Sequence, residues 1–526
     1  MVQGQEAWAA ELKPEATKTL QTLQSLLAIL LGLIQALAMT YPINGAVTAA
    51  LQVAGFSAFI CFIGRVENTY LNSWLFATSW LLGSVAWLYI ALHVHGHMPP
   101  ALSIITMLML CGGLAIYYST AIWASMALRN RSQPLQGVML IAVAWTTAEM
   151  ARAQWFTGFP WAAIGYAQIN SYLSYLAAWV GVYGVGFASV LLAGVMAMLW
   201  EKKKVKHRLL VIAVVLLLLL QAERPVSEGQ NQLQFTLLQA NISQDSKFSS
   251  GRADALHWYK EEIMKSKADI TVLPETAIPY FQSDLPAEYW QSIEHKYANK
   301  QQAAIIGIPT RNTQNEYGNS AVALGMTAGP SQYDKYHLVP FGEFTPDGLK
   351  WFTQVVDFGM TDFIRGSQQP APMVWNGHKL AVNICYEDLF GEELAKRFVL
   401  EQDKVPDVLV NISNIGWFGN NYVVDQHLNI ARMRSLEFNR PTVRATNSGG
   451  TAIISAQGRV LSALQPYTRG VLTGEVATGA KEITPYAYWA GHWGLKPLWL
   501  FCAAIWVIAF WSYKKKREAQ NRECAQ

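Results

Sequence analysis

A glutamate, a lysine and a cysteine in the second half of the chain stand where short apolar runs end. Ile270–Leu273 leads through a proline into Glu275, Leu380–Ile384 leads directly into Cys385, and Lys335 lies in a third segment of this kind. A thiol attacks a carbonyl as its thiolate and needs a base or a cation nearby. A carboxylate can take the thiol proton, and a lysine can stabilise the oxyanion that forms. These residue types predict acyl transfer through a thioester on Cys385.

These side chains stand among short strands that alternate with helices, which predicts an α/β domain over residues 222–492. Sites in such domains are assembled at the carboxyl ends of strands, so the three residues are expected to converge. The later strands follow one another closely, which indicates sheet without crossovers. Strands are predicted at Gln234–Leu238, Ile270–Leu273, Ala303–Ile308, Ala321–Leu324, Leu380–Ile384, Val408–Ile412, Thr442–Ala445 and Thr451–Ser455, and helices at Ala253–Lys267 and Glu392–Leu400.

The first 221 residues have the composition of a membrane-embedded bundle. The whole chain is 52% hydrophobic and only 14% charged, against about 25% charged for an ordinary soluble chain. Several apolar runs are near the ~20 residues that cross a bilayer. Eight spans are predicted, at Leu23–Met39, Ala46–Ile63, Trp74–Leu92, Ala101–Met126, Val138–Met150, Tyr172–Leu199, Leu209–Leu220 and Trp493–Trp511.

Basic clusters predict the orientation, because Lys and Arg concentrate in cytoplasmic loops. Such clusters lie at 202–208, at 514–517 and at Arg129 and Arg131. Eight spans with both termini in the cytoplasm place all three clusters inside and residues 222–492 outside. The predicted domains are therefore a seven-helix bundle (1–221), an extracytoplasmic catalytic domain (222–492), and an eighth span with a basic cytoplasmic tail (493–526).

Charge and cysteine usage argue against other classes of function. The net charge of +4 is too small and too dispersed to predict nucleic-acid binding. The five cysteines form no CxxC pair and suggest neither a disulfide framework nor a zinc site. His93, His95 and His97 have a spacing that invites a metal interpretation, but no acidic or thiol partner is nearby in sequence. A loop at a membrane edge explains them better.

Beyond these single residues, whole motifs resemble the nitrilase (carbon–nitrogen hydrolase) superfamily, and in particular its membrane branch, the apolipoprotein N-acyltransferases. Glu275, Lys335 and Cys385 match the Glu-Lys-Cys triad of the superfamily in order and context. Phe248, Ile415 and Met150 stand where the family commonly has Trp, Asp and Trp. The matching stretches are Pro274–Pro279, Lys335–Glu343, Cys385–Glu387, Asn411–Asn414, Trp417–Gly419, Gln426–Leu428, Ala431–Arg434, Arg440–Pro441, Arg444–Asn447, Phe156–Trp161 and Gly165–Tyr166.

The resemblance implies a nitrilase-like αββα sandwich and a role for each site residue. Glu275 would act as base and then acid, and Lys335 would stabilise both oxyanions. Glu343 would position the lysine. Residues Tyr386 and Glu387 would support the site. No metal or cofactor is implied.

The resemblance also implies the substrates and the location. A phospholipid, typically phosphatidylethanolamine, would donate an acyl chain to the thiol. The acceptor would be the α-amino group of the S-diacylglyceryl cysteine at the N-terminus of an apolipoprotein, in the last step of lipoprotein maturation. The expected setting is a bacterial inner membrane, with a monomeric enzyme whose catalytic domain faces the periplasm.

Two other functions stay open at this point. A membrane-anchored amidase would use the same three residues but leaves the matches in the membrane part unexplained. A transporter with an inactive accessory domain predicts ionisable residues inside the spans, and here Glu149 and Arg152 stand near a span edge. Trp155, Trp161 and Tyr166 fit either a lipid path or an interfacial aromatic belt. The aromatic stretch Trp351–Phe363 is a candidate gating loop.

Overall fold

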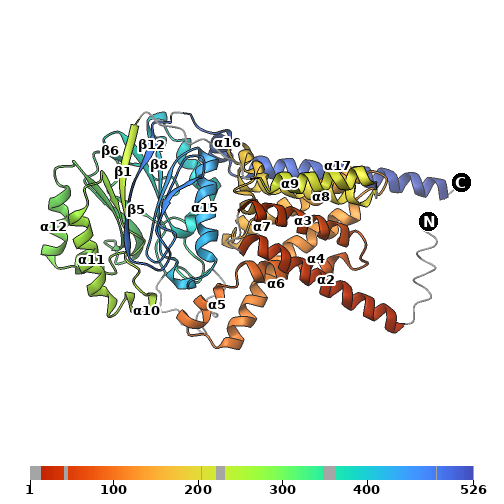
Figure 1. Cartoon of the computed structure of the whole chain (residues 1–526), viewed down its shortest axis with the longest axis horizontal. Helices are drawn as coiled ribbons and strands as arrows, with labels where there is room; N and C mark the ends of the chain where they lie inside the picture. The colour runs from red at the N-terminus through yellow and green to blue at the C-terminus, as the bar shows by residue number, and fades with distance from the viewer. Residues whose placement is uncertain are drawn as a thin grey trace.

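The computed structural model describes residues 14–40, 45–202, 204–220, 231–346, 362–480 and 482–524. Long helices form one half of the molecule, and two sheets with flanking helices form the other half (Figure 1). The described chain begins and ends at the end of the helical half that is remote from the sheets (Figure 1). The chain thus leaves the bundle, builds the sheet domain, and returns to the bundle in its last helix.

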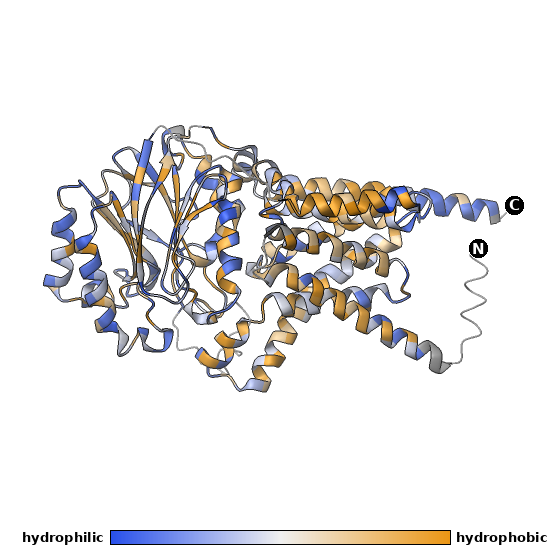
Figure 2. Cartoon of the chain, viewed as in Figure 1, coloured by the Kyte–Doolittle hydropathy of each residue, from blue (hydrophilic) through white to orange (hydrophobic). Residues whose placement is uncertain are grey.

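The helical half is a bundle of predominantly apolar helices (Figure 2). Among the described residues, four helices are long and apolar enough to cross a membrane, or five if one bent pair counts as a single span. The predicted count of eight spans therefore exceeds what length and composition establish. The helices are α2 (Pro14–Thr40), α3 (Gly45–Ile63), α4 (Thr69–Ser84), α5 (Leu88–Ile90), α6 (Pro100–Leu128), α7 (Pro134–Gln154), α8 (Ala177–Glu201), α9 (Val205–Leu218) and α17 (Lys496–Cys524).

The predicted span Trp74–Leu92 is not one continuous helix. It breaks after Ser84, and the two pieces are bent by 67°. The carbonyls released at the break are bound by side chains of the sheet domain: Tyr422 donates to Gly83 O at 2.8 Å and Gln426 Nε2 donates to Ser84 O at 3.0 Å. Because backbone groups in an apolar setting must find partners, these two donors make the break possible.

Two ionisable residues near the end of α7 serve the backbone of the loop that follows. Glu149 accepts from the Ile164 N–H at 2.8 Å. Arg152 donates to the carbonyls of Phe159 and Trp161. Both side chains therefore stabilise the loop at the end of the bundle. A structural role explains their presence without a transport path, so they do not favour the transporter hypothesis.

The other half is an αββα sandwich, as predicted. One sheet has the strand order β12-β1-β2-β3-β4-β5 and the other β11-β10-β9-β8-β7-β6. The central pairs are parallel, whereas β9-β10-β11 run antiparallel without crossovers. The strands are β1 (Asn231–Gln239), β2 (Ile270–Val272), β3 (Ala303–Arg311), β4 (Tyr317–Leu324), β5 (Gln332–Asp334), β6 (Met373–Trp375), β7 (His378–Ile384), β8 (Val408–Ser413), β9 (Thr442–Thr446), β10 (Ala452–Ile454), β11 (Val460–Ala463) and β12 (Gly470–Thr478).

Apolar side chains between and outside the sheets hold the sandwich together. A core that includes Phe235 and Val382 fills the space between the two sheets. Helices α11 (Gly251–Lys265) and α12 (Ala287–Tyr297) cover the first sheet on the side remote from the bundle (Figure 1). The second sheet is covered by α14 (Gly391–Ala395), α15 (Val423–Phe438) and α16 (Pro485–Trp493). Of these, α15 lies between the second sheet and the bundle.

All eight predicted strands are confirmed, but four strands were missed. Strands β5 and β6 have only three residues each, and β11 and most of β12 alternate exposed with half-buried positions, so neither forms a continuous buried apolar run. The predicted helix Ala253–Lys267 is confirmed as α11. The predicted helix Glu392–Leu400 is shorter, because α14 ends at Ala395 and is followed by a 3₁₀ turn.

Gly307 on β3 packs directly against the main chain of Pro274 and Glu275. A Cβ at this position would lie 1.9 Å from Pro274 O and 2.8 Å from Glu275 Cα. We expect Gly307→Ala to destabilise the domain by about 1–3 kcal/mol, because the strand end must move. Thermal unfolding in detergent measures the effect. The control is Gly113→Ala in α6, where nothing lies within 4 Å of the new Cβ; equal melting temperatures for both variants would contradict the prediction.

Candidate active site

The three predicted residues follow strands from both sheets and meet in the interior of the domain. Glu275 comes shortly after β2 and Lys335 directly after β5, in the first sheet, while Cys385 directly follows β7 in the second. Lys335 Nζ lies 3.3 Å from Glu275 Oε1. The Cys385 thiol lies within electrostatic range of both side chains. The expected convergence of these side chains is therefore present.

Lys335 is buried between two carboxylates. Its Nζ donates to Glu343 Oε1 at 2.9 Å as well as to Glu275, and its exposed fraction is 1%. Burial alone would lower the pKa of Lys335, but Glu275 and Glu343 outweigh burial and raise it above its ordinary value. Lys335 is therefore charged throughout the physiological range, and a buried cation of this kind is able to stabilise an oxyanion.

An asparagine that the sequence reasoning missed completes this cluster. Asn319 Nδ2 donates to Glu275 Oε1 at 2.7 Å and to Glu343 Oε1 at 2.6 Å. The remaining oxygen of Glu275 accepts from the Asn414 main-chain N–H at 2.8 Å. These donors fix the orientation of both carboxylates. The available signal was the polar pair Asn319 and Ser320 near the start of β4, ahead of its apolar end.

Cys385 sits on a strained turn at the end of β7. Its φ is +53°, in the left-handed region that residues other than glycine seldom adopt. Burial raises the pKa of the Cys385 thiol to about 12; Glu275 raises it too, and Lys335 opposes them. The thiol is therefore protonated at neutral pH. Its attack on a carbonyl needs a base that removes the proton, and Glu275 is the facing carboxylate.

Glu387 joins the nucleophile strand to the lysine segment. Its carboxylate accepts from the main-chain N–H groups of Ile384, Tyr336 and His337 at 2.7, 2.8 and 3.1 Å. The hydroxyl of Tyr333 donates to it as well. The predicted supporting position thus holds the two segments that carry Cys385 and Lys335 in fixed register.

Tyr386 connects the site to the helical half. Its hydroxyl donates to Gly158 O at 3.1 Å, and His337 contacts Thr157 O at 3.1 Å. Thr157 and Gly158 belong to the loop after α7. Tyr386, next to Cys385, and His337, close to Lys335, therefore both contact the helical half of the molecule.

A second buried chain of contacts holds the nucleophile from the side of α15. His427 Nε2 lies 3.3 Å from Cys385 O, and Arg444 donates to His427 Nδ1 at 2.8 Å. Arg444 in turn lies 3.8 Å from Asp388. Burial, followed by Arg444, holds the pKa of His427 well below its usual range, so the ring is neutral. With Arg444 donating to Nδ1, the proton sits on Nε2 and is donated to Cys385 O.

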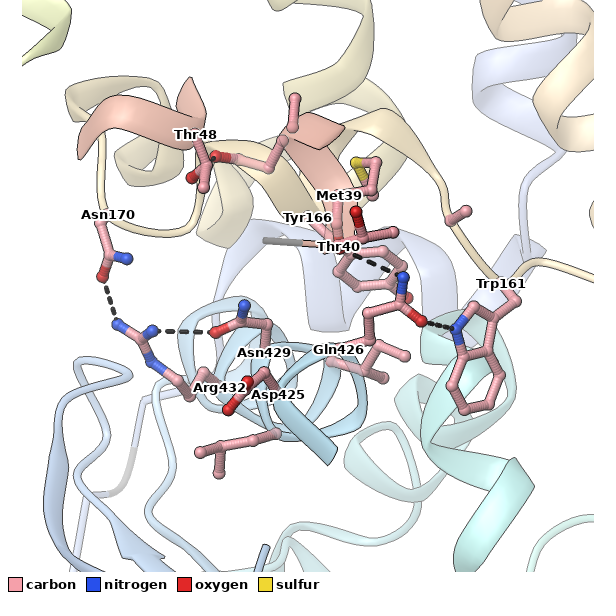
Figure 3. A pocket seen from close by; sticks show the side chains of 15 residues that line it. Met39, Thr40, Thr48, Trp161, Tyr166, Asn170, Asp425, Gln426, Asn429 and Arg432 are labelled. Atoms are coloured by element: carbon pink, nitrogen blue, oxygen red, sulfur yellow. Dashed lines mark hydrogen bonds between the residues drawn. The ribbon is translucent and has the colours of Figure 1, made fainter. Parts of the chain in front are cut away.

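A separate cavity of about 230 Å³ lies where the bundle meets α15, and it includes none of the six predicted site residues. Figure 3 shows Gln426 reaching across it to the Trp161 indole and to Met39, while Arg432 reaches Asn170. Trp161 and Tyr166 line this cavity and are 3% and 5% exposed. They are not part of a lipid-facing aromatic belt, whereas Trp155 is exposed at the bundle surface.

Of the candidate gating loop Trp351–Phe363, residues 351–361 lie outside the described residues. Within the described part of the chain, no group of three or more His, Cys, Asp or Glu side chains could hold a metal ion. His93 instead contacts Met98 O at 2.8 Å, and His95 contacts Asp245 at 3.0 Å.

Glu387→Gln would disturb the main-chain hydrogen bonds that this carboxylate accepts. An amide NH₂ in place of one oxygen would face main-chain N–H donors, so buried donors would lose their acceptor. We expect a loss of about 1–3 kcal/mol in domain stability and slower alkylation of the Cys385 thiol. Thermal unfolding and peptide mass mapping after iodoacetamide treatment measure these effects. The exposed Glu401→Gln is the control; a Glu387→Gln protein that melts and reacts like it would contradict the positioning role.

The comparisons with known proteins agree on both halves of the chain. The family described as "Apolipoprotein N-acyltransferase N-terminal domain" matches residues 24–195, and the family described as "Carbon-nitrogen hydrolase" matches residues 236–484. An apolipoprotein N-acyltransferase of Verminephrobacter eiseniae is 41% identical, over 89% of this chain and 92% of the relative. Relatives with the same name from Ralstonia nicotianae (35%, 88% of each chain) and Nitrosomonas europaea (36%, 79% of this chain and 84% of the relative) are also similar.

These matches extend over both the helical bundle and the sandwich that holds the glutamate, lysine and cysteine. The chain is a membrane protein of the apolipoprotein N-acyltransferase family.

Proposed function

We propose that this enzyme moves an acyl chain from a phospholipid, through a thioester on Cys385, to the α-amino group of the S-diacylglyceryl cysteine of an apolipoprotein. The observation that carries the proposal is the buried Lys335, held between Glu275 and Glu343 beside the thiol. The N-acyltransferase activity follows from the family. The phospholipid donor and the roles of the individual residues belong to the proposal.

The first half-reaction forms the thioester. Glu275 takes the proton of the Cys385 thiol, and Sγ attacks the ester carbonyl of the phospholipid. Lys335 stabilises the oxyanion of the tetrahedral intermediate. The ester C–O bond then breaks, and Glu275 returns the proton to the departing glycerol oxygen, which leaves as the lysophospholipid alcohol.

The second half-reaction transfers the acyl chain from Cys385 to the acceptor. The neutral α-amino group of the acceptor attacks the thioester carbonyl, and Lys335 again stabilises the oxyanion. Glu275 takes a proton from the attacking nitrogen and gives it to Sγ as the C–S bond breaks. An amide forms, and the thiol is restored. Glu343 and Asn319 keep the lysine and the base in place, and Glu387 and Tyr386 keep the two segments together.

For the membrane arrangement we propose eight spans with both termini in the cytoplasm of a bacterium. Residues 1–221 and 493–526 would form the membrane part in the inner membrane, and residues 222–492 would face the periplasm as a monomeric catalytic domain. The basic clusters at 202–208 and 514–517 support this orientation. Both clusters lie away from the sheet domain, at the far end of the bundle and on the hydrophilic extension of α17 (Figures 1 and 2).

Cys385→Ala tests the thioester. Purified protein incubated with phosphatidylethanolamine alone should gain the mass of one acyl chain, and hydroxylamine should remove it. A diacylated lipopeptide should discharge it. The Cys385→Ala protein should gain no acyl mass and melt within a few degrees of the wild type.

Cys61→Ala, which removes a thiol from α3, is the matched control and should acylate normally. If Cys385→Ala still forms the adduct, the mechanism is wrong. A wild-type protein without adduct that hydrolyses a small amide would instead favour the amidase hypothesis.

Glu275→Gln tests the base. Glutamine keeps the size of the side chain and can still accept from Asn319, but it cannot take the thiol proton. We expect acylation of Cys385 to be slower by about 10²–10⁴-fold, followed as the time course of the acyl adduct. The exposed Glu261→Gln is the control. Acylation within a few-fold of the wild-type rate would exclude Glu275 as the base.

A further inference from the structure

A second lysine is buried beside the site, on the segment that precedes α11. Lys247 is the last residue of α10 (Gln244–Lys247) and is 2% exposed. Its Nζ donates to the main-chain oxygen of Glu275 at 3.2 Å. The side chains whose charges it faces are Glu275 and Cys385. A buried ammonium needs compensation, and both candidate partners belong to the catalytic site.

The helical turn that carries Lys247 is hydrogen-bonded to a residue that also contacts Glu275. Gln244 Oε1 accepts from Asn414 Nδ2 at 2.9 Å, and the main-chain N–H of Asn414 donates to Glu275 Oε2. The next residue, Phe248, is 48% exposed. The chain therefore turns Lys247 into the interior and leaves its neighbour at the surface.

The charges of the Glu275, Glu343 and Lys335 cluster balance only if Lys247 is included. Glu275 and Glu343 bring two negative charges, and Lys335, which contacts both, brings one positive charge. Lys247 supplies the second positive charge. Outside this cluster, Arg444 is paired with Asp388 and His427 is neutral. The Glu387 carboxylate is held by main-chain N–H donors and the Tyr333 hydroxyl, and Lys247 has no contact with it.

We propose that Lys247 is a positioning residue for the acyl transfer: its ammonium holds the Glu275 main chain and offsets the second carboxylate of the site, which keeps the Cys385 thiol ionisable. This inference rests on the proposed function of Cys385 and Glu275. Without Lys247 the site would carry a net negative charge next to the thiol. A further negative charge on Sγ would then be disfavoured.

Burial lowers the pKa of Lys247 to about 8, while Glu275 and Cys385 oppose this shift. The side chain is therefore mostly protonated at neutral pH and loses its proton as the pH rises through that value. Its electrostatic contribution is present below that value, and Lys335 remains charged above it.

The test is the pH dependence of iodoacetamide alkylation at Cys385, read by mass mapping of the peptide that contains it. We expect Lys247→Gln to slow alkylation about tenfold at pH 7, where the wild-type lysine is charged. The difference should shrink as the pH rises above about 8, where the wild-type lysine loses its proton. Lys247→Arg keeps the charge and should restore most of the wild-type profile. Lys265→Gln, an exposed lysine at the end of α11, is the matched control and should change nothing.

A Lys247→Gln alkylation profile that coincides with the wild type would overturn the proposal. So would a loss of alkylation rate that is equally large in Lys247→Arg, which keeps the charge. If Lys247→Gln does not fold, Lys247→Met, an apolar side chain of similar length that suits a buried position, is measured in the same way. Failure of the proposed function has a different signature, because it appears as a missing acyl adduct on the wild-type protein whatever the alkylation profile.

Discussion

The structure of the site depends on keeping one ammonium group charged inside a protein interior. Lys335 is almost fully buried, and burial alone would drive it to the neutral form. Glu275 and Glu343 prevent this by direct contact, and Asn319 binds both carboxylates at the same time. Because removing one partner of a buried charge cluster leaves the others uncompensated, each member constrains the rest. The sheets must therefore deliver these side chains to one point.

A related constraint governs the junction of the bundle and the sandwich. Several bundle helices end or break near the sheet domain, where main-chain groups lose their helical partners. In α8 the break falls at Gly181, whose φ is +64° and where a Cβ would collide with Tyr486. The freed N–H of Val182 donates to Glu437 of α15 at 2.7 Å. As at the break after α4, polar side chains of the sandwich satisfy the bundle backbone, so neither half is complete without the other.

The candidate site is tied to this junction as well. Tyr386 and His337, which neighbour the nucleophile and the lysine, both contact the loop after α7. On the other side, His427 holds the main chain of Cys385 from α15, the helix that also carries Gln426 into the junction. The strained φ of Cys385 is thus maintained by contacts from its own domain and from the elements next to the bundle.

Patterns in the amino-acid sequence predict the candidate site residues and most of the architecture. Reactive residue types at strand ends and apolar periodicity are local signals, so Glu275, Lys335, Cys385 and all eight predicted strands could be read from single segments. The further side chains that contact these residues emerge from the folding of distant segments onto one another. Asn319, His427 and Lys247 act through contacts with segments distant in sequence, and no local pattern marks such a contact. The bend after α4 has the same origin, because its freed carbonyls are bound by side chains more than three hundred residues away.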